Sequence, residues 1–257
     1  MRTVVLALPL ALCSFGADTN EPSAAEIDNI IAKFAAKEAE FSLARENYTY
    51  RQHVRIQETD PGGGAFEVVS DIIFSAEGKR TERVVRAPVP TLRRIQLTPE
   101  DEQDLRAVQP FVLTTNELSK YFIRYLGKQK LDEIPCLTFA VKPRKLEPGQ
   151  RYFQGTVWVD DRDLQIVKSY GRATGVKKKG FDYQFPKFET YREQVDGKYW
   201  FPTYTIANDT LNFDSGPVRI RMSVRYADYK QFKSDVKITF EDKPADVKPA
   251  TPDPKKK

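Results

Sequence analysis

Histidine and cysteine are nearly absent from this chain, which limits the chemistry that it can perform. Its 257 residues include one histidine, His53, and two cysteines, Cys13 and Cys136. A Ser-His-Asp or Cys-His enzyme would have to use this one histidine, and a histidine-rich metal centre needs several, so the composition nearly excludes these classes. If the leader that carries Cys13 is removed, one thiol remains and no disulfide can form within the chain. We therefore expect Cys136 to be a small buried residue and His53 to lie at the surface.

The common catalytic motifs are missing as well. The sequence contains no G-x-S-x-G, no phosphate-binding glycine loop, no H-E-x-x-H and no C-x-x-C. Asp160, Asp161 and Asp163 could supply a carboxylate pair, but they fall in a turn, where aspartate serves local geometry. We predict that the protein is not an enzyme and that it uses no cofactor and no metal.

A strong excess of one charge is also lacking. Lys and Arg number 41, Asp and Glu 36, and the formal net charge is +5. This balance is too weak to indicate nucleic acid, which requires a focused basic face, but it is compatible with contact to an anionic membrane surface. The loop from Gly175 to Gly180, with Lys177, Lys178 and Lys179, is either solvated or in contact with acidic lipid head groups.

The single long apolar run lies at the amino terminus, from Val4 to Leu12. It is too short to cross a bilayer, which takes about 20 apolar residues. With Arg2 before it and small residues after it, the run predicts a secretory signal peptide over residues 1–17. Cleavage could follow Gly16, or Cys13 could be lipidated within a lipobox-like sequence. In both cases we expect the protein in the periplasm, free or anchored as a lipoprotein.

Aromatic residues, at 12%, are plentiful and fall within segments that alternate apolar and polar residues. Alternation with a period of two predicts half-buried strands. Asp160–Asp163 and Asp196-Gly197 predict tight turns between them. The expected strands cover residues 48–56, 66–74, 79–86, 121–131, 135–142, 152–160, 164–174, 187–195, 198–207, 218–232 and 236–240. Short connections between about eleven antiparallel strands predict a sheet curled into a whole or partial barrel.

One long helix is expected before the strands, from Glu21 to Asn47. Ser23 and Glu26 have the spacing of a capping box. Apolar residues recur at helical spacing and should pack on the sheet. From this face we select as lid candidates Ile27, Ile31 and Phe34.

A second interruption, Ala87 to Ser119, breaks the strand pattern with Pro88 and Pro90. Thr98-Pro99 predicts the start of a short helix that runs to about Val108, and Thr114 to Tyr121 predicts a further helical turn. A connection of this length is either a lid or a structural cover over one end of the sheet.

Two motifs suggest a family. Trp158-Val159-Asp160 followed by Leu164 to Lys168, and the later run Asp196 to Pro202, resemble the strand–turn–strand and D-G-x-W-x-P hairpin of the LolA/LolB-like outer-membrane lipoprotein-sorting proteins. That superfamily includes the amino-terminal domain of the RseB/MucB regulators. The likeness covers roughly Ala24 to Phe240. It implies a half-open antiparallel barrel around a helical lid, an apolar interior that receives acyl chains, and no enzyme activity.

We accordingly expect three parts: the signal peptide (1–17), a LolA/LolB-like half-barrel domain (18–241) and a disordered Pro/Lys tail (242–257). The expected function is a monomeric periplasmic protein that binds lipid or lipoprotein acyl chains and takes part in lipoprotein sorting. The alternative is an envelope-stress sensor that binds another periplasmic protein. The candidate cavity residues are Phe74, Phe139, Val141, Phe153, Val157, Val159, Ile166 and Tyr204. We expect Trp158 and Trp200 outside the cavity or at its rim.

Overall fold

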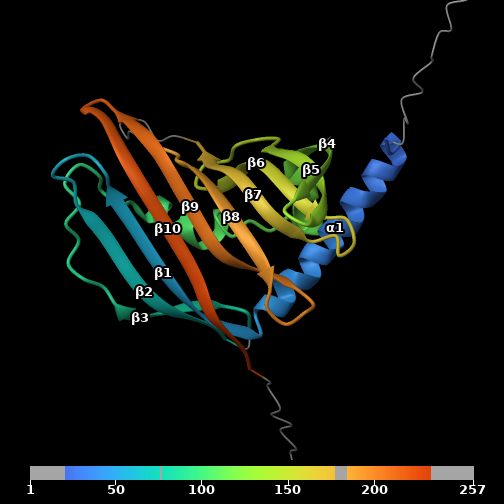
Figure 1. Ribbon diagram of the computed structural model, residues 1–257, viewed down its shortest axis with the longest axis horizontal. Coiled ribbons are helices and arrows are strands. Elements are labelled where there is room, and N and C mark those ends of the chain that lie inside the picture. Colours follow the sequence, from blue (N-terminus) through green and yellow to red (C-terminus); the bar gives the residue numbers. More distant parts are fainter. Residues whose placement is uncertain (1–20, 76, 177–183, 233–257) are drawn as a thin grey trace, which may run out of the picture.

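Every strand of the described chain joins one curved antiparallel sheet (Figure 1). The computed structural model describes residues 21–75, 77–176 and 184–232. Helix α1 (Ala24–Arg45) precedes β1 (Tyr48–Glu58), β2 (Ala65–Phe74) and β3 (Arg80–Arg86). Then come α2 (Pro99–Gln103), the π-helical turn η1 (Asp104–Val108) and the 3-10 helix η2 (Thr115–Lys120). The last strands are β4 (Tyr121–Leu131), β5 (Ile134–Pro143), β6 (Arg151–Asp160), β7 (Ile166–Gly175), β8 (Lys187–Gln194), β9 (Trp200–Phe213) and β10 (Gly216–Gln231).

The ten strands are ordered β3-β2-β1-β10-β9-β8-β7-β6-β5-β4, so that β3 and β4 are the two edges and the sheet does not close. This confirms the predicted mainly β fold, a curved half-open sheet with an amino-terminal helix and short helices. The expected strand 236–240, the leader 1–17 with Cys13, the lysines at 177–179 and the tail 242–257 lie outside the described residues. Strand β9 extends six residues beyond the predicted end at Ala207, because Asn208 to Phe213 pair with β10.

Two glycines on neighbouring strands allow close packing on the concave face. Gly155 and Gly171 are directly opposite each other on β6 and β7. A Cβ atom on Gly155 would lie 2.1 Å from the backbone oxygen of Tyr170 and 2.9 Å from the ring of Phe153. The ring of Phe153 therefore occupies the space that side chains at positions 155 and 171 would otherwise fill. Phe153 in turn stacks on Phe111, with 4.4 Å between the ring centroids.

Helix α1 lies diagonally across one end of the concave face. Phe34 packs on Phe139 of β5, with 5.3 Å between ring centroids, and Phe41 packs edge-on to Phe201 of β9 at 5.2 Å. Both residues on α1 are fully buried. The predicted capping box is present, with Ser23 N–H donating to Glu26 at 2.7 Å. The helix therefore starts at Ala24, slightly inside the predicted start at Glu21.

The connection between the two edge strands, residues 87–120, crosses the other end of the concave face and is called the crossing segment below. In Figure 1 its green helical turns lie behind β8–β10. Thr98 caps α2 as predicted, and the helix continues as a π-helical turn as far as Val108. The predicted turn near Thr114 is the 3-10 helix η2. The position of the crossing segment agrees with both sequence interpretations, a lid and a structural cover.

Candidate functional site

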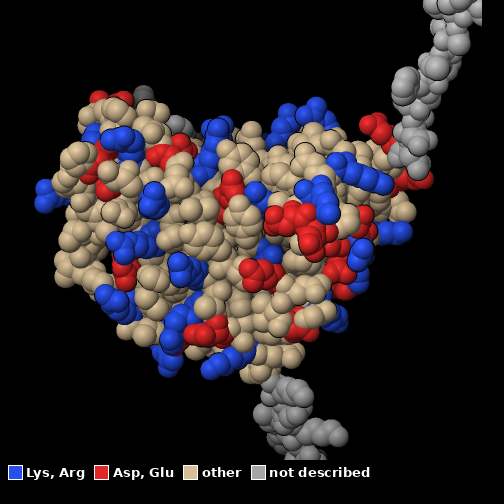
Figure 2. Space-filling model, in the orientation of Figure 1, with Lys and Arg blue, Asp and Glu red and all other residues tan. Residues whose placement is uncertain are grey.

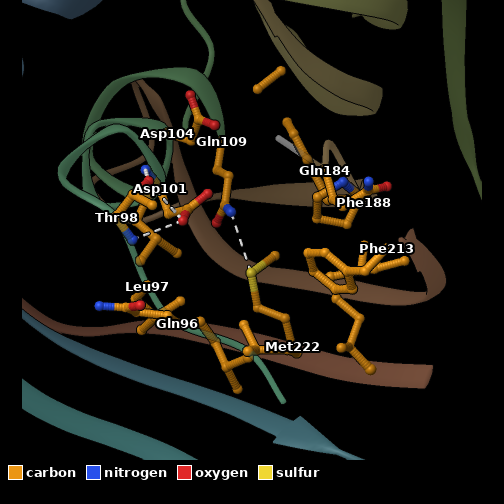
Figure 3. Close-up of a pocket in the computed structure, with 17 residues that line it drawn as sticks. Gln96, Leu97, Thr98, Asp101, Asp104, Gln109, Gln184, Phe188, Phe213 and Met222 are labelled. Carbon is orange, nitrogen blue, oxygen red and sulfur yellow. Dashed lines mark hydrogen bonds between the residues drawn. The ribbon is translucent and has the colours of Figure 1, made fainter. Parts of the chain in front are cut away.

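A small apolar cavity lies between the crossing segment and the sheet (Figure 3). Its volume is about 110 Å³. The apolar lining comes from five strands, from the loop before β8, from the residues before α2 and from η1, and it consists of Ile56, Ile95, Leu97, Leu105, Ala173, Pro186, Phe188, Leu211, Phe213, Ile220 and Met222. The polar lining residues are Gln96, Thr98, Asp101, Asp104, Gln109 and Gln184. Ligand pockets usually measure roughly 300–1,000 Å³, so this cavity is smaller than a typical ligand site.

One buried carboxylate fastens the start of the crossing segment to the sheet. Glu58, at the end of β1, is 2% exposed. It accepts hydrogen bonds from the backbone N–H groups of Gly64 (2.9 Å), Arg93 (3.1 Å), Arg94 (2.6 Å) and Ile95 (2.9 Å). Burial acts to raise the pKa of Glu58, but these four donors hold it below its ordinary value.

We expect this contact to weaken in acid. Because the pKa of Glu58 is lowered in the folded protein, its stabilisation is present above the ordinary carboxylate pKa of about 4.3 and is lost as the pH falls through the lowered value. Amide protection factors at Arg93 to Ile95 should therefore fall between pH 5 and pH 3. Glu58→Gln should lower the free energy of unfolding by about 1–3 kcal/mol at pH 7 and remove most of this pH dependence.

The control is Glu40→Gln, on the exposed side of α1, where the side chain is 51% exposed and pairs with the similarly exposed Lys37. It should change the free energy of unfolding by less than about 0.5 kcal/mol and leave the protection factors of residues 93–95 unchanged. Wild-type protection in Glu58→Gln would show that the carboxylate does not hold the crossing segment.

A second ionic contact holds the middle of the crossing segment. Arg151 of β6 donates to both carboxylate oxygens of Asp104, through Nε at 2.8 Å and through Nη2. Burial raises the pKa of Asp104, and the guanidinium of Arg151 opposes that shift. Two hydrogen bonds hold the backbone at the end of η1. Gln109 N–H donates to the carbonyl of Asp104 at 2.9 Å, and the hydroxyl of Thr190 donates to the carbonyl of Gln109 at 2.8 Å. The backbone of Gln109 is thus held by η1 and by β8.

A third contact joins the helix, the sheet and the crossing segment. Glu38 of α1 is fully buried and accepts from Ile166 N–H at 2.9 Å and from both Nη atoms of Arg192 at 3.1 and 3.2 Å. Arg192 also donates to the carbonyl of Phe111. Burial raises the pKa of Glu38 and lowers the pKa of Arg192, which means that dehydration disfavours both charges. We call this group of four residues the buried latch.

The predicted cavity residues lie on the concave face with one exception. Phe74, Phe139, Val141, Phe153, Val157, Val159 and Ile166 are buried in one apolar core cluster. None of them lines the cavity, because α1 and the crossing segment already pack against them. Tyr204 lies on the opposite face, between Tyr191 of β8 and Arg225 of β10, and the Cζ atom of Arg225 is 6.0 Å from the Tyr204 ring centroid.

The lid candidates on α1 face the sheet. Phe34 is in the core cluster, and Ile27 and Ile31 pack against it from the rim. Trp158 and Trp200 do not line the cavity, and their indole N–H groups donate to Gln129 and Asp163. The residues that line the cavity were missed, because a strand pattern shows which face is apolar but not which end of that face α1 leaves uncovered.

The residues considered for chemistry have structural roles. Asp160 accepts from the backbone N–H groups of Arg162 and Asp163 at 2.7 and 2.8 Å, as expected of a turn aspartate. Cys136 is buried, as predicted, and burial raises its pKa to about 11. His53 lies on the outer face 3.5 Å from Glu67. In the described ranges, no group of three or more His, Cys, Asp or Glu residues is placed to hold a metal ion, and no helix has the length and apolar character needed to cross a membrane.

Comparison with known proteins gives structural neighbours only. No family model and no curated sequence matches the chain. The chain is similar in fold to a LolA superfamily protein from Nitrosomonas europaea. That match has a TM-score of 0.38 and 14% identity, and it covers 80% of this chain and 93% of the other.

Two other solved structures show a similar likeness. A DUF1329 family protein from Desulfovibrio piger matches with a TM-score of 0.41 and 12% identity, over 82% and 94% of the two chains. A putative outer membrane lipoprotein-sorting protein domain from Vibrio parahaemolyticus matches with a TM-score of 0.36 and 13% identity, over 77% and 92%. At these TM-scores the likeness is loose, so the function has to be inferred from the residues of this chain.

Proposed function

We propose that the protein is a non-enzymatic periplasmic carrier that shields the acyl chains of a lipid or lipoprotein, with a role in outer-membrane lipoprotein sorting. The observation that carries this proposal is the apolar cavity at one end of a concave face whose remaining surface is covered by α1 and the crossing segment. Such a site offers a hydrocarbon chain an apolar surface on five strands. The apolar leader is consistent with export to the periplasm.

The closed cavity of about 110 Å³ is too small for a whole acyl chain, so binding requires the crossing segment or α1 to move away from the sheet. Each buried methylene contributes roughly 0.8 kcal/mol. A ten-carbon chain can therefore supply several kcal/mol, which is comparable with the roughly 3–5 kcal/mol associated with breaking a buried ion pair such as Glu38–Arg192. In the opened state the cavity would join the surface formed by Phe139, Phe153 and their neighbours.

The proposal is tested by extracting lipid from protein purified from the periplasm and identifying it by mass spectrometry, together with uptake of a fluorescent acyl probe by delipidated protein. We expect co-purified acyl lipid and saturable uptake. Protein that is free of lipid and takes up no probe would contradict the proposal. Capture of a periplasmic protein by such lipid-free protein would favour the sensor alternative instead.

A cavity-filling variant provides a sharper test. Ala173 of β7 lines the cavity and is 4% exposed. Ala173→Leu should fill much of the cavity and reduce probe uptake at least tenfold, at a cost of about 1–3 kcal/mol in the free energy of unfolding. The matched control is Ala207→Leu on β9, which is 2% exposed and does not line the cavity. It should show a similar loss of stability with normal uptake. Equal uptake by the two variants would place the acyl chain elsewhere.

A further inference from the structure

The amide of Gln109 is the polar group of the cavity that lacks a good partner. Gln109 is 4% exposed, and its side chain extends into the cavity toward Met222 (Figure 3). Its Nε2 atom donates to the sulfur of Met222 at 3.3 Å, and its Oε1 atom is buried and accepts a hydrogen bond from no described residue. A thioether is only a weak acceptor. Nearly the whole hydrogen-bonding capacity of this amide is therefore unused.

The position of this amide is set by the backbone. The π-helical turn ends in the 2.9 Å bond from Gln109 N–H to Asp104, and Thr190 holds the Gln109 carbonyl from β8. Pro110 follows and restricts the chain further. An unpaired buried amide costs roughly 1–3 kcal/mol, and the contact with Met222 directs this amide into the cavity. Its retention in an apolar cavity is explained if a ligand supplies the missing partner.

The chemistry of the missing partner follows from the surroundings. The described lining holds two carboxylates, Asp101 and Asp104, and no Lys, Arg or His, and Arg151 already pairs with Asp104, so a ligand carboxylate at this place would lack a countercharge. A hydroxyl group is neutral and small, and it both donates and accepts, so it satisfies Gln109 in either orientation of the amide.

We propose that Gln109 selects hydroxylated acyl chains, by hydrogen bonding to a hydroxyl group carried on the part of the chain that enters the cavity. This inference rests on the proposed acyl-binding function and adds to it a specificity-determining residue and a narrower class of ligand. A site that hydrogen-bonds a ligand hydroxyl discriminates against the analogue that lacks it, because the site's own polar group is then left unpaired.

The test uses esters that differ by one hydroxyl group, in competition with a fluorescent acyl probe on the wild-type protein. Methyl decanoate is compared with its 2-hydroxy, 3-hydroxy and 10-hydroxy derivatives. We expect at least one hydroxylated ester to bind roughly 2- to 10-fold more tightly than methyl decanoate, the ratio that one net hydrogen bond provides. In Gln109→Met, which keeps the side-chain length, the preference should disappear while methyl decanoate binds at least as well as before.

The possible failures are distinct. If the probe and all esters fail to bind the wild-type protein, the proposed function itself is wrong. If all esters bind equally to the wild-type protein, or if Gln109→Met keeps the preference, acyl binding stands and the role of Gln109 is refuted. Because the comparison among esters uses the wild-type protein, it does not depend on the folding of the variant.

Discussion

Arg192→Met is expected to lower the free energy of unfolding by about 3–5 kcal/mol, because it leaves the fully buried carboxylate of Glu38 without its countercharge. The loss is greater than for a surface ion pair, since no water reaches Glu38 to replace the guanidinium. Urea unfolding followed by circular dichroism at pH 7 measures it. Arg225→Met, at an exposed position on the outer face, is the control and should change the free energy by less than about 0.5 kcal/mol.

The double variant Glu38→Met/Arg192→Met separates the ion pair from the packing around it. Burial shifts the pKa of Glu38 upward and that of Arg192 downward, so each charge is disfavoured at its site. Replacing both by apolar side chains should therefore recover most of the loss, leaving the double variant within about 1–2 kcal/mol of wild type. A loss in the double variant equal to the sum of the losses in Glu38→Met and Arg192→Met would show that the two side chains contribute independently, and would contradict their role as an ion pair. If the buried latch holds α1 and the crossing segment against the sheet, the double variant should take up the acyl probe faster than wild type.

Phe34→Ala is expected to cost about 3–5 kcal/mol in the free energy of unfolding. Phe34 is fully buried and packs 5.3 Å from the ring of Phe139, so truncation leaves a cavity beneath α1. Thermal and urea unfolding measure the effect. Under the proposed function the same change enlarges the apolar site, so the variant should bind acyl probe with higher capacity at temperatures where it remains folded.

Leu43→Ala provides the control on the same helix. Leu43 is 68% exposed, so its truncation removes little packing and should change the free energy of unfolding by less than about 0.5 kcal/mol. A loss below about 1 kcal/mol for Phe34→Ala would mean that α1 rests only loosely on the sheet. In that case the helix would not be the element that covers Phe139 and its neighbours.

Local patterns in the sequence were enough to predict the elements. Ser23 and Glu26 start α1 at almost the predicted residue, and Thr98 starts α2. Strand β4 has its predicted ends, Tyr121 and Leu131. These features depend on hydrogen bonds and side-chain alternation within a few residues, which a single sequence displays directly. The end of β9 was predicted too early because Asn208 and Asp209 favour turns when alone, whereas pairing with β10 keeps them extended.

Contacts between distant residues account for what could not be predicted. Nothing in the pattern of β1 or β10 shows that they pair with each other, yet this pairing unites the first three strands with the last seven and leaves β3 and β4 as edges. Likewise, Glu38 and Arg192 each look like ordinary surface charges in their own segments. They are buried because α1 lies across β7 and β8 there.

The sequence by itself determined that the chain is rich in strands, lacks the histidines and cysteines of common active sites, and offers an apolar face suited to binding. The tertiary structure decided where on the concave face a cavity remains. Helix α1 covers the end of the concave face that holds Phe139 and Val159, and the cavity remains at the other end, between Gln109 and Met222. The physical reason is that the alternation of apolar and polar residues shows which side of a strand avoids water. Which helix or loop covers that side depends on contacts between residues far apart in the chain.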